Sequence, residues 1–494
     1  MLLMSKFERF VVIICIGSIT IVNSLHVLTE YLANPPDRLF TAIAHYWTDY
    51  FLYISQMAQG SLLSRHMFTN EPLPPTWIYW FNGLIGALGT RGGLSVFATY
   101  NISLIGLVAL LGFCWYRLCL KLYPSSPMRR LVCLLFLLTA SNFFTLFHGS
   151  FGLMGDVWFS PTPALNRLGG VPHQVFQTIL LMMVILLFHS THRSKLVLLC
   201  VVTFLASIAN PVQMILVIAA LAWTKNWQTL VPTAIIAATG AILANREFSL
   251  QPILSVAKQW ELAQYVSINP WELFVSFGPV GLLCLIGLVT IRRKQASLKT
   301  SFVLYGILSL ILFLLPIGHL VGISPVRWLH PAAYAGILII AVDGFFLVGK
   351  KVPVGILIAL YLMLTIPSLW VQTTSRTSPE NLNHLPLSVA RALAFLKSQK
   401  EDFVVITDPQ LPYDVIVPAL TKKRSFTGHP IHTLYPDVKE RLRNEFFWGQ
   451  MDDHSALQFL KDHDIGYIFS MQIPRYSFLK TVYSQHNIII AAVQ

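Results

Sequence analysis

Charged residues are scarce in this chain of 494 residues. Asp, Glu, Lys and Arg together make up 12% of the sequence, whereas soluble domains carry about 25%. This scarcity, together with 55% hydrophobic residues, excludes a soluble globular protein. The net charge of +13 does not indicate a nucleic-acid partner, because the basic residues form short clusters between apolar segments, as orientation signals of membrane proteins do.

Cysteine motifs are absent as well. The chain has six cysteines, all in or beside hydrophobic stretches, and none forms a CxxC pair or accompanies a cluster of histidines. The sequence therefore predicts neither a disulfide framework nor a zinc site.

Long apolar segments are abundant instead. A helix needs about 20 apolar residues to cross the hydrocarbon core, and about 17 as a practical minimum. Asn210-Pro211 is expected to separate two short spans rather than lie inside one long helix. Residues 76–89 are expected to form a partial or membrane-surface helix, because a crossing there would move the basic cluster 117–130 to the outer side. About eleven spans remain, near 10–28, 97–116, 131–147, 175–189, 196–208, 211–223, 230–244, 273–291, 302–320, 332–348 and 354–370.

The positive-inside rule gives the expected orientation of this helical bundle. Lys and Arg fall on the same side of every second span, at 6–9, 117–130, 193–195, 225, 292–299 and 350–351. We therefore expect a multi-pass protein of the plasma (inner) membrane with a cytoplasmic N-terminus. The first span lacks a clear small-residue cleavage site and is expected to remain as a helix.

The tail is predicted to be an extracytoplasmic α/β domain of residues 372–494, following a transmembrane domain of residues 1–371. Its alternating pattern favours a small, mainly parallel sheet. Helices are expected near 387–397, 413–420, 437–449, 454–462 and 478–485, and strands at 403–407, 467–470 and 488–493, with a further strand around Ser425.

Two motifs of the tail contain histidine. Asp452-Asp453-His454 is interpreted as a helix N-cap rather than a metal site. His429 and His432 lack a spacing that specifies a metal site, and we interpret them as part of a substrate-facing loop.

An acid among aromatic residues follows the first span closely. Asp49 lies in the segment AHYWTDYFLY of residues 44–53, at the start of a long outer loop. One interpretation is an aromatic belt at the headgroup level with a solvated Asp. Further along the loop, the segment TNEPLPPT of residues 69–76 leads into the expected partial helix, and its prolines fix the direction of the chain there.

This layout resembles that of the GT-C class of membrane glycosyltransferases, which includes protein O-mannosyltransferases, lipid A aminoarabinose transferases and oligosaccharyltransferase catalytic subunits. The shared features are a cytoplasmic N-terminus, a first helix, a long outer loop with an acid soon after it, and a Pro-Pro segment. Some branches also carry an extracytoplasmic C-terminal domain, so the resemblance covers the whole chain.

The resemblance implies an activity in the cell envelope. A sugar would pass, with inversion, from a polyprenyl-phosphate donor to an acceptor glycan, lipid or protein on the extracytoplasmic face. Asp49 maps onto the class's acid, which acts as general base or metal ligand. The class often pairs this acid with another, whereas here the neighbours are Thr48 and Tyr50. The expected cofactor is therefore either none or a divalent cation (Mg²⁺ or Mn²⁺), held by Asp49 with Asp156 as the second carboxylate.

The departing lipid phosphate gains negative charge and needs cationic donors, for which the planar fork of Arg is well suited. Arg327, in a tight outer loop, is the first choice, and its alternative role is snorkelling to headgroups. Arg167 and His173, in the second outer loop, rank next. His45, one helical turn before Asp49, could orient the acid or the phosphate.

Three further residues of the first outer loop complete the expected site. They are assigned to a substrate-facing loop: Tyr50, Tyr53 and Glu71.

Two alternatives come from other classes of protein. Ionisable residues within spans often mark transport pathways, and Asp343 is the clearest here, although an ion pair with Lys350 at the helix end would explain it. No inverted repeat supports a transporter or lipid flippase. A non-catalytic membrane scaffold is the third hypothesis.

Overall fold

The computed structural model describes residues 5–44, 46–147, 150–153, 161–191, 195–263, 269–290, 297–315, 317–320, 322–376 and 379–494. They form two compact units. The helical unit comprises Met1–His26, Leu104–Arg246 and Glu261–Arg376, and the α/β unit comprises Val27–Ser103, Glu247–Trp260 and Thr377–Gln494. The tail thus shares its compact unit with the first outer loop, and the predicted domain boundary between residues 371 and 372 stays a prediction.

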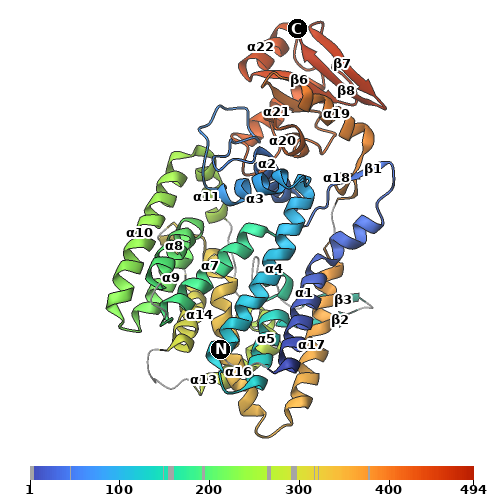
Figure 1. Ribbon diagram of the computed structural model, residues 1–494. Coiled ribbons are helices and arrows are strands. Elements are labelled where there is room, and N and C mark those ends of the chain that lie inside the picture. Colours follow the sequence, from blue (N-terminus) through green and yellow to red (C-terminus); the bar gives the residue numbers. More distant parts are fainter. Residues whose placement is uncertain are drawn as a thin grey trace. The chain divides into compact units, whose positions relative to one another are not determined.

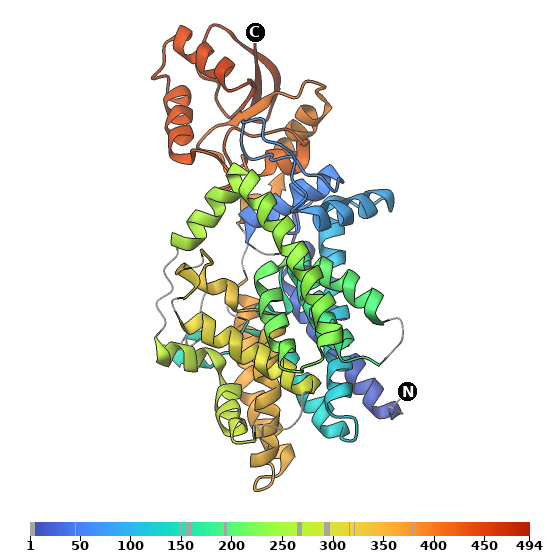
Figure 2. The same cartoon turned by 90° about the vertical axis from the view of Figure 1, so that its left-hand side faces the viewer.

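The helical unit is a bundle of apolar helices (Figures 1 and 2). Its members are α5 (Pro127–Thr139), α6 (Ala164–Leu168), α7 (Pro172–Phe188), α8 (Lys195–Ala209), α9 (Pro211–Ala222), α12 (Pro270–Phe277), α13 (Pro279–Leu288), α14 (Leu298–Leu314), α15 (Ile317–Leu320), η1 (Pro325–Trp328), α16 (Pro331–Val348) and α17 (Val354–Thr374). Parts of α1 (Lys6–Leu32), α4 (Val96–Leu122), α10 (Trp227–Leu250) and α11 (Pro252–Ala263) belong to it too.

Helix α16 is the centre of this bundle, because 72% of its residues are buried, against 17% for the best span of α17. It packs on α13 and α14. Gly306 of α14 and Gly336 of α16 allow a close approach of these two helices, since a Cβ at either position would meet main-chain atoms of the other helix.

Five helices are long and apolar enough to cross a membrane, namely α1, α4, α10, α16 and α17. The pair α12 and α13, bent by 98°, could form one more span. Four shorter apolar helices, α7, α8, α9 and α14, accompany them. This apolar composition identifies a membrane protein, and the count of eleven spans stays a prediction.

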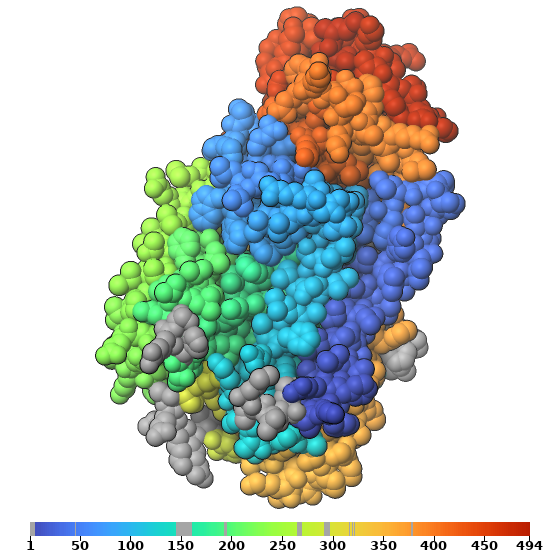
Figure 3. Space-filling view, in the orientation of Figure 1, coloured from blue at the N-terminus to red at the C-terminus, as the bar shows by residue number. Residues whose placement is uncertain are grey.

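The outward positions of the long helices agree with a lipid environment. Helices α1 and α4 both reach the surface seen in Figure 3. Large apolar side chains are exposed on both helices, among them Ile13, Ile14, Ile21, Ile105, Leu110 and Phe113. A lipid environment would remove these apolar surfaces from water, which is favourable.

The structure tests two predicted features of the bundle, the break at Asn210-Pro211 and the helix over 131–147. The break at Asn210-Pro211 is confirmed: the Asn210 side chain caps α9 by accepting from the Gln213 amide, and Pro211 occupies the first helical position. The expected single helix over 131–147 is wrong. Helix α5 ends at Thr139, and Phe144–Phe147 forms strand β2, paired with β3 (Ser150–Leu153).

The α/β unit contains a four-stranded sheet in the order β5 (Val404–Thr407), β6 (Ile465–Ser470), β8 (Ile488–Val493), β7 (Leu479–Gln485). Only β5 and β6 are parallel, and the other two pairs are antiparallel, so the expected mainly parallel sheet is wrong. The expected helix at 478–485 is strand β7. This segment forms a strand because a two-residue turn, His486-Asn487, folds it back onto β8 as a hairpin. The positive φ values of these two residues, 46° and 63°, suit such a tight turn.

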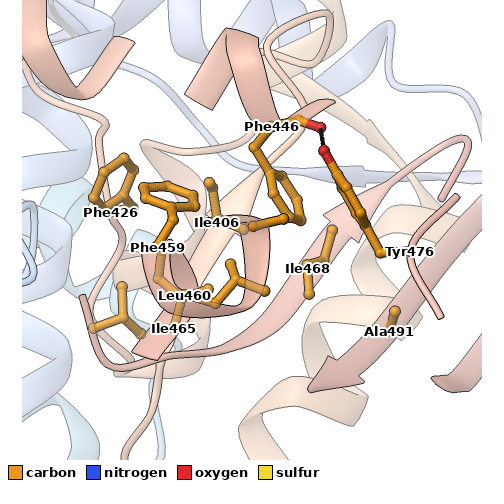
Figure 4. Packing of buried hydrophobic residues seen from close by; sticks show 11 residues of the cluster. Ile406, Phe426, Phe446, Phe459, Leu460, Ile465, Ile468, Tyr476 and Ala491 are labelled. Atoms are coloured by element: carbon orange, nitrogen blue, oxygen red, sulfur yellow. Dashed lines mark hydrogen bonds between the residues drawn. The ribbon is translucent and has the colours of Figure 1, made fainter. Parts of the chain in front are cut away.

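One face of this sheet carries the hydrophobic core of the tail (Figure 4). Helices α21 (Pro436–Phe447) and α22 (Asp453–Asp462) cover it. Phe446 stacks on Tyr476 with ring centroids 5.0 Å apart, and the Tyr476 hydroxyl donates to the Phe446 carbonyl at 2.9 Å. The predicted N-cap is confirmed, because the Asp452 side chain accepts from the Ser455 amide at 2.7 Å.

The remainder of the α/β unit combines elements of the first outer loop with others of the tail. Its elements are α2 (Trp47–Gln59), α3 (Trp80–Arg91), α18 (Glu380–Asn383), α19 (Leu387–Ser398), α20 (Ile416–Thr421) and the antiparallel pair β1 (Arg38–Phe40) and β4 (His384–Pro386). The expected partial helix at 76–89 is α3. The segment after α2 joins the tail directly, since the Ser425 amide donates to the Met67 carbonyl at 2.9 Å.

Candidate active site

Asp49 lies in the first turn of α2, where a negative charge is favoured by the helix dipole. Its side chain is 31% exposed, and its Oδ1 is 3.1 Å from Nε2 of His429, which is 2% exposed. The two residues are 380 positions apart in the sequence. A buried imidazole from the tail therefore holds a carboxylate of the first outer loop that still reaches solvent.

The tautomer of His429 follows from its second contact. Its Nδ1 accepts from the Ile431 amide at 3.3 Å. A neutral imidazole has one donor and one acceptor nitrogen, so in that form Nε2 carries the hydrogen and donates to Asp49 Oδ1. This contact fixes one carboxylate oxygen and leaves Oδ2 without a contact to His429.

A second histidine, His432, packs against His429. The rings of His429 and His432 meet edge to face with centroids 4.7 Å apart, and His432 Nε2 is 3.4 Å from the Tyr79 hydroxyl. Burial, and to a smaller degree the neighbouring His429 and His66, hold the pKa of His432 well below its usual range. Burial and the charge of Asp49 raise the pKa of Tyr79. Both groups are therefore neutral at physiological pH.

A small cavity adjoins this cluster. Its volume is about 10 Å³, roughly the space that one water molecule needs. Tyr79 and His432 belong to its lining, with Leu52, Ser55, Gln56, Arg65, His66, Met67 and Phe68. His66 Nε2 is 3.1 Å from Gln251 Oε1, and burial lowers the pKa of His66 despite that contact. The polar groups behind Asp49 thus lie in a nearly closed space.

Glu71, predicted to lie in a substrate-facing loop, forms an ion pair with Lys439 of α21 at 2.8 Å and also accepts from Thr69. Burial alone would raise the pKa of Glu71, but hydrogen bonds from Lys439 and Thr69 outweigh it and hold the pKa below its ordinary value. Burial likewise lowers the pKa of Lys439. The pair ties the first outer loop to the tail.

The two predicted tyrosines differ in exposure. Tyr50 is completely buried, and its hydroxyl donates to the Thr41 carbonyl at 2.6 Å. Tyr53 is half-buried on the same helix. His45 and Asp156 lie outside the described residues.

The predicted phosphate ligands belong to the helical unit. Arg327 lies in η1 with a side chain that is 60% exposed, and its Nε is 2.7 Å from Glu261 Oε1. His173 is half-buried in the first turn of α7. Asp49, Tyr50, Tyr53 and Glu71 belong to the α/β unit instead.

Arg167 has a different environment, because its side chain is 1% exposed and all of its N–H donors face main-chain carbonyls. The acceptors are the carbonyls of Phe136, Leu137, Ala140, Pro161 and Thr162. The first three lie at the C-terminal end of α5, where the Phe136 carbonyl also accepts from the Ala140 amide. Arg167 thus bonds to carbonyls at the end of that helix, where the intrahelical pairing stops. The phosphate role of Arg167 stays a prediction, and no donor is left over for it in this arrangement.

Sequence reasoning assigned His429 to a substrate-facing loop but did not connect it with Asp49. No local spacing links two residues so far apart. The short Gly428-His429-Pro430 motif marks His429 as a candidate in the sequence, but it does not indicate which residue His429 contacts.

A metal site is not evident among the residues that the structure describes, since no three His, Cys, Asp or Glu side chains form a group that could hold an ion. Among the contacts of Asp49 in the described residues, His429 is the only one of these four residue types. The divalent cation stays a prediction.

No family model matches the chain, and no curated protein matches it. Solved structures do. The Archaeoglobus fulgidus oligosaccharyltransferase AglB, in complex with an inhibitory peptide and a dolichol-phosphate, is similar over 94% of this chain and 70% of its own, with a TM-score of 0.52 and 11% identity. The apo form of the oligosaccharyltransferase from the same organism is similar over 92% of this chain and 69% of its own, with a TM-score of 0.51 and 10% identity.

The arabinofuranosyltransferase AftD from Mycobacteria is similar over 100% of this chain and 40% of its own, with a TM-score of 0.59 and 13% identity. Both neighbours are GT-C glycosyltransferases. Since identities this low show the fold alone, the conclusion is that this chain has the GT-C fold that its layout predicted.

Proposed function

We propose that the protein is a membrane glycosyltransferase that moves a sugar from a polyprenyl-phosphate donor to an acceptor on the extracytoplasmic face, with Asp49 as general base. The observation that carries this proposal is the Asp49 carboxylate, partly exposed to solvent and in contact with the buried ring of His429. The GT-C fold supports it, and the AglB neighbour is bound to a dolichol-phosphate, a lipid phosphate of the proposed donor class.

The chemistry is a single displacement at the anomeric carbon. An acceptor hydroxyl forms the new bond to that carbon as the bond to the donor phosphate breaks, and the electron pair leaves with the phosphate oxygen. The transition state resembles an oxocarbenium ion, and Asp49 takes the proton of the acceptor hydroxyl. Attack opposite the leaving group inverts the anomeric configuration.

His429 acts as a positioning residue in this proposal. Its Nε2–H bond to Oδ1 leaves Oδ2 as the proton acceptor and limits rotation of the carboxylate. Arg327 is proposed as the phosphate ligand, because its exposed guanidinium has bonding capacity beyond the single Nε contact with Glu261. Tyr50 and Glu71 would support α2 and the loop rather than contact the sugar directly.

The test is the change Asp49→Asn, which keeps the shape of the side chain and removes the base. Sugar transfer from a polyprenyl-phosphate donor in isolated membranes should fall by about 100-fold or more. Asp37→Asn is the matched control, since Asp37 is exposed in the same outer loop. Undiminished transfer by Asp49→Asn, with normal expression, contradicts the proposal.

Nothing in the described part of the chain favours the transporter alternative. Asp343, its main support, is paired with Lys299 of α14 at 2.5 Å, not with Lys350 as expected. This ion pair joins two packed helices. Solute flux that survives Asp49→Asn and fails in Asp343→Asn would nevertheless identify a transporter, and a scaffold would tolerate both changes.

A further inference from the structure

A basic cavity lies in the helical unit at the C-terminal end of α16. Its volume is about 220 Å³, and its lining comes from the ends of several helices: Arg129, Thr290, Lys299, Asp343, Phe346, Leu347 and Lys350. Arg327 lies just before the other end of α16. The 18 residues of that helix span about 27 Å at 1.5 Å per residue, so this cavity is separate from the proposed phosphate ligand.

The cavity carries a positive charge. Three cationic residues line it with one carboxylate, which gives 3 − 1 = +2. Asp343 is engaged by Lys299, so it neutralises that cation and does not face a ligand as an isolated anion. Within the described ranges, Arg129 and Lys350 have no carboxylate partner.

The helix ends add no net charge to the cavity. Helices α5 and α14 both begin beside the cavity, after the N-caps Ser126 and Ser297. The N-terminus of a helix carries a partial positive charge. The C-termini of α13 and α16, which carry the opposite partial charge, also lie beside the cavity. The unpaired cations, and not the helix ends, therefore favour an anion.

The guanidinium of Arg129 is positioned to bind a tetrahedral anion. Its guanidinium lies over the ring of Phe346, 5.0 Å from the centroid, which limits its motion. In the part of the chain that the structure covers, no hydrogen bond occupies its terminal nitrogens. A planar fork of this kind binds phosphate through two parallel bonds, and Lys350 adds a point charge.

From these features we propose that the cavity binds a phosphate group. A volume of about 220 Å³ equals the space of about seven water molecules and is smaller than the roughly 300–1,000 Å³ of sites for drug-sized ligands. This space accommodates a phosphate group. The charge rule predicts that this end faces the cytoplasm, where anionic lipids are abundant. The phosphate comes either from a lipid headgroup or from the aqueous phase.

The test uses the purified full-length protein in phosphatidylcholine nanodiscs and in detergent. The first probe is phosphatidic acid incorporated into the nanodiscs, and the second is inorganic phosphate, with chloride at the same ionic strength as reference. Ligand retention by native mass spectrometry and the shift of the melting temperature are the measurements. A response to phosphatidic acid alone identifies a lipid headgroup, and a response to inorganic phosphate identifies a soluble phosphate.

The decisive variants are Arg129→Gln and Lys350→Gln. Each should weaken the response by about tenfold, the equivalent of one charge-assisted hydrogen bond. Lys351→Gln is the matched control, because Lys351 is the exposed neighbour of Lys350 and does not line the cavity. Asp49→Asn should bind as the unmodified protein does, so the test is independent of the proposed transfer activity.

Two results would overturn the site. One is no saturable response of the unmodified protein to either probe. The other is equal affinity in Lys350→Gln and Lys351→Gln. Lys350 is exposed at a helix end, so this comparison remains valid even if Arg129→Gln does not fold.

Discussion

At the scale of single residues, the contact between His429 and Asp49 matters most. The imidazole is buried, and both of its nitrogens have partners, one on the main chain and one on the carboxylate. The sequence could indicate Asp49 through its place after the first span. It could not indicate His429 as the partner, because only the folded tail brings the two together.

The contact predicts how variants of His429 behave. His429→Ala should lower the rate of sugar transfer by about tenfold, since it removes one hydrogen bond to a charged group. His429→Gln retains an N–H donor at a similar reach and should restore most of the rate. Initial rates in membranes, with the melting temperature of each purified variant, are the measurements.

A purely structural role for His429 would give a different result. Activity would then follow the loss of thermal stability and not the presence of a donor. Equal rates for the Ala and Gln variants at equal stability would therefore exclude the positioning role.

At the scale of elements, local signals were reliable where side chains cap or break a helix. The cap at Asp452 and the break at Asn210-Pro211 were both predicted, because each depends on neighbours in the sequence. The end of α5 was missed, since its last carbonyls are satisfied by Arg167, which lies some thirty positions further along. The hairpin of β7 and β8 was missed because the positive φ values of His486 and Asn487 were not recognised as a turn.

The packing of α3 on α2 gives a prediction at this scale. Gly86 of α3 faces the main chain of Met57 on α2, and an added Cβ would meet the Met57 carbonyl. Gly86→Ala should therefore lower the free energy of unfolding by about 1–3 kcal/mol. Because α2 carries Asp49, transfer should fall too. Thermal melting in detergent and transfer rates provide the check.

Gly106→Ala is the control for that experiment. Gly106 lies in α4 with no atom within 4 Å of an added Cβ. Its replacement should leave stability unchanged or raise it by up to about 1 kcal/mol, the helix propensity of Ala over Gly. If both changes have the same effect, close packing of α2 and α3 is not the cause.

At the scale of the whole molecule, composition and charge pattern were sufficient to predict a membrane protein, because both are properties of long segments. The GT-C fold was predicted from the resemblance in layout. The composition of the compact units could not be predicted. It depends on side-chain contacts such as Glu71 with Lys439, which join the first outer loop to the tail across more than 360 positions. Hydropathy carries no information on such pairs.

The buried histidines make the stability of the α/β unit dependent on pH. His432 and His66 have folded pKa values below the ordinary 6.5, mainly because burial disfavours the charged ring. Below pH 6.5 the unfolded chain binds more protons than the folded one, so the free energy of unfolding falls as the pH decreases. The slope is at most about 1.4 kcal/mol per pH unit for each such histidine, and it applies between the folded pKa and 6.5.

The melting temperature should therefore be lower about one unit below pH 6.5 than about one unit above it. His432→Gln should reduce this difference, whereas His454→Gln, at an exposed position of α22, should not. An unaltered pH dependence in His432→Gln would show that another group is responsible.

The turn between β7 and β8 has a practical use. His486 and Asn487 are exposed, and the strand pairing on either side ends at Gln485 and Ile488. An epitope inserted between them would leave the sheet intact and would lie far along the chain from Asp49 and its partner. Antibody access to such a tag in sealed and opened vesicles would tell on which side of the bilayer the tail resides.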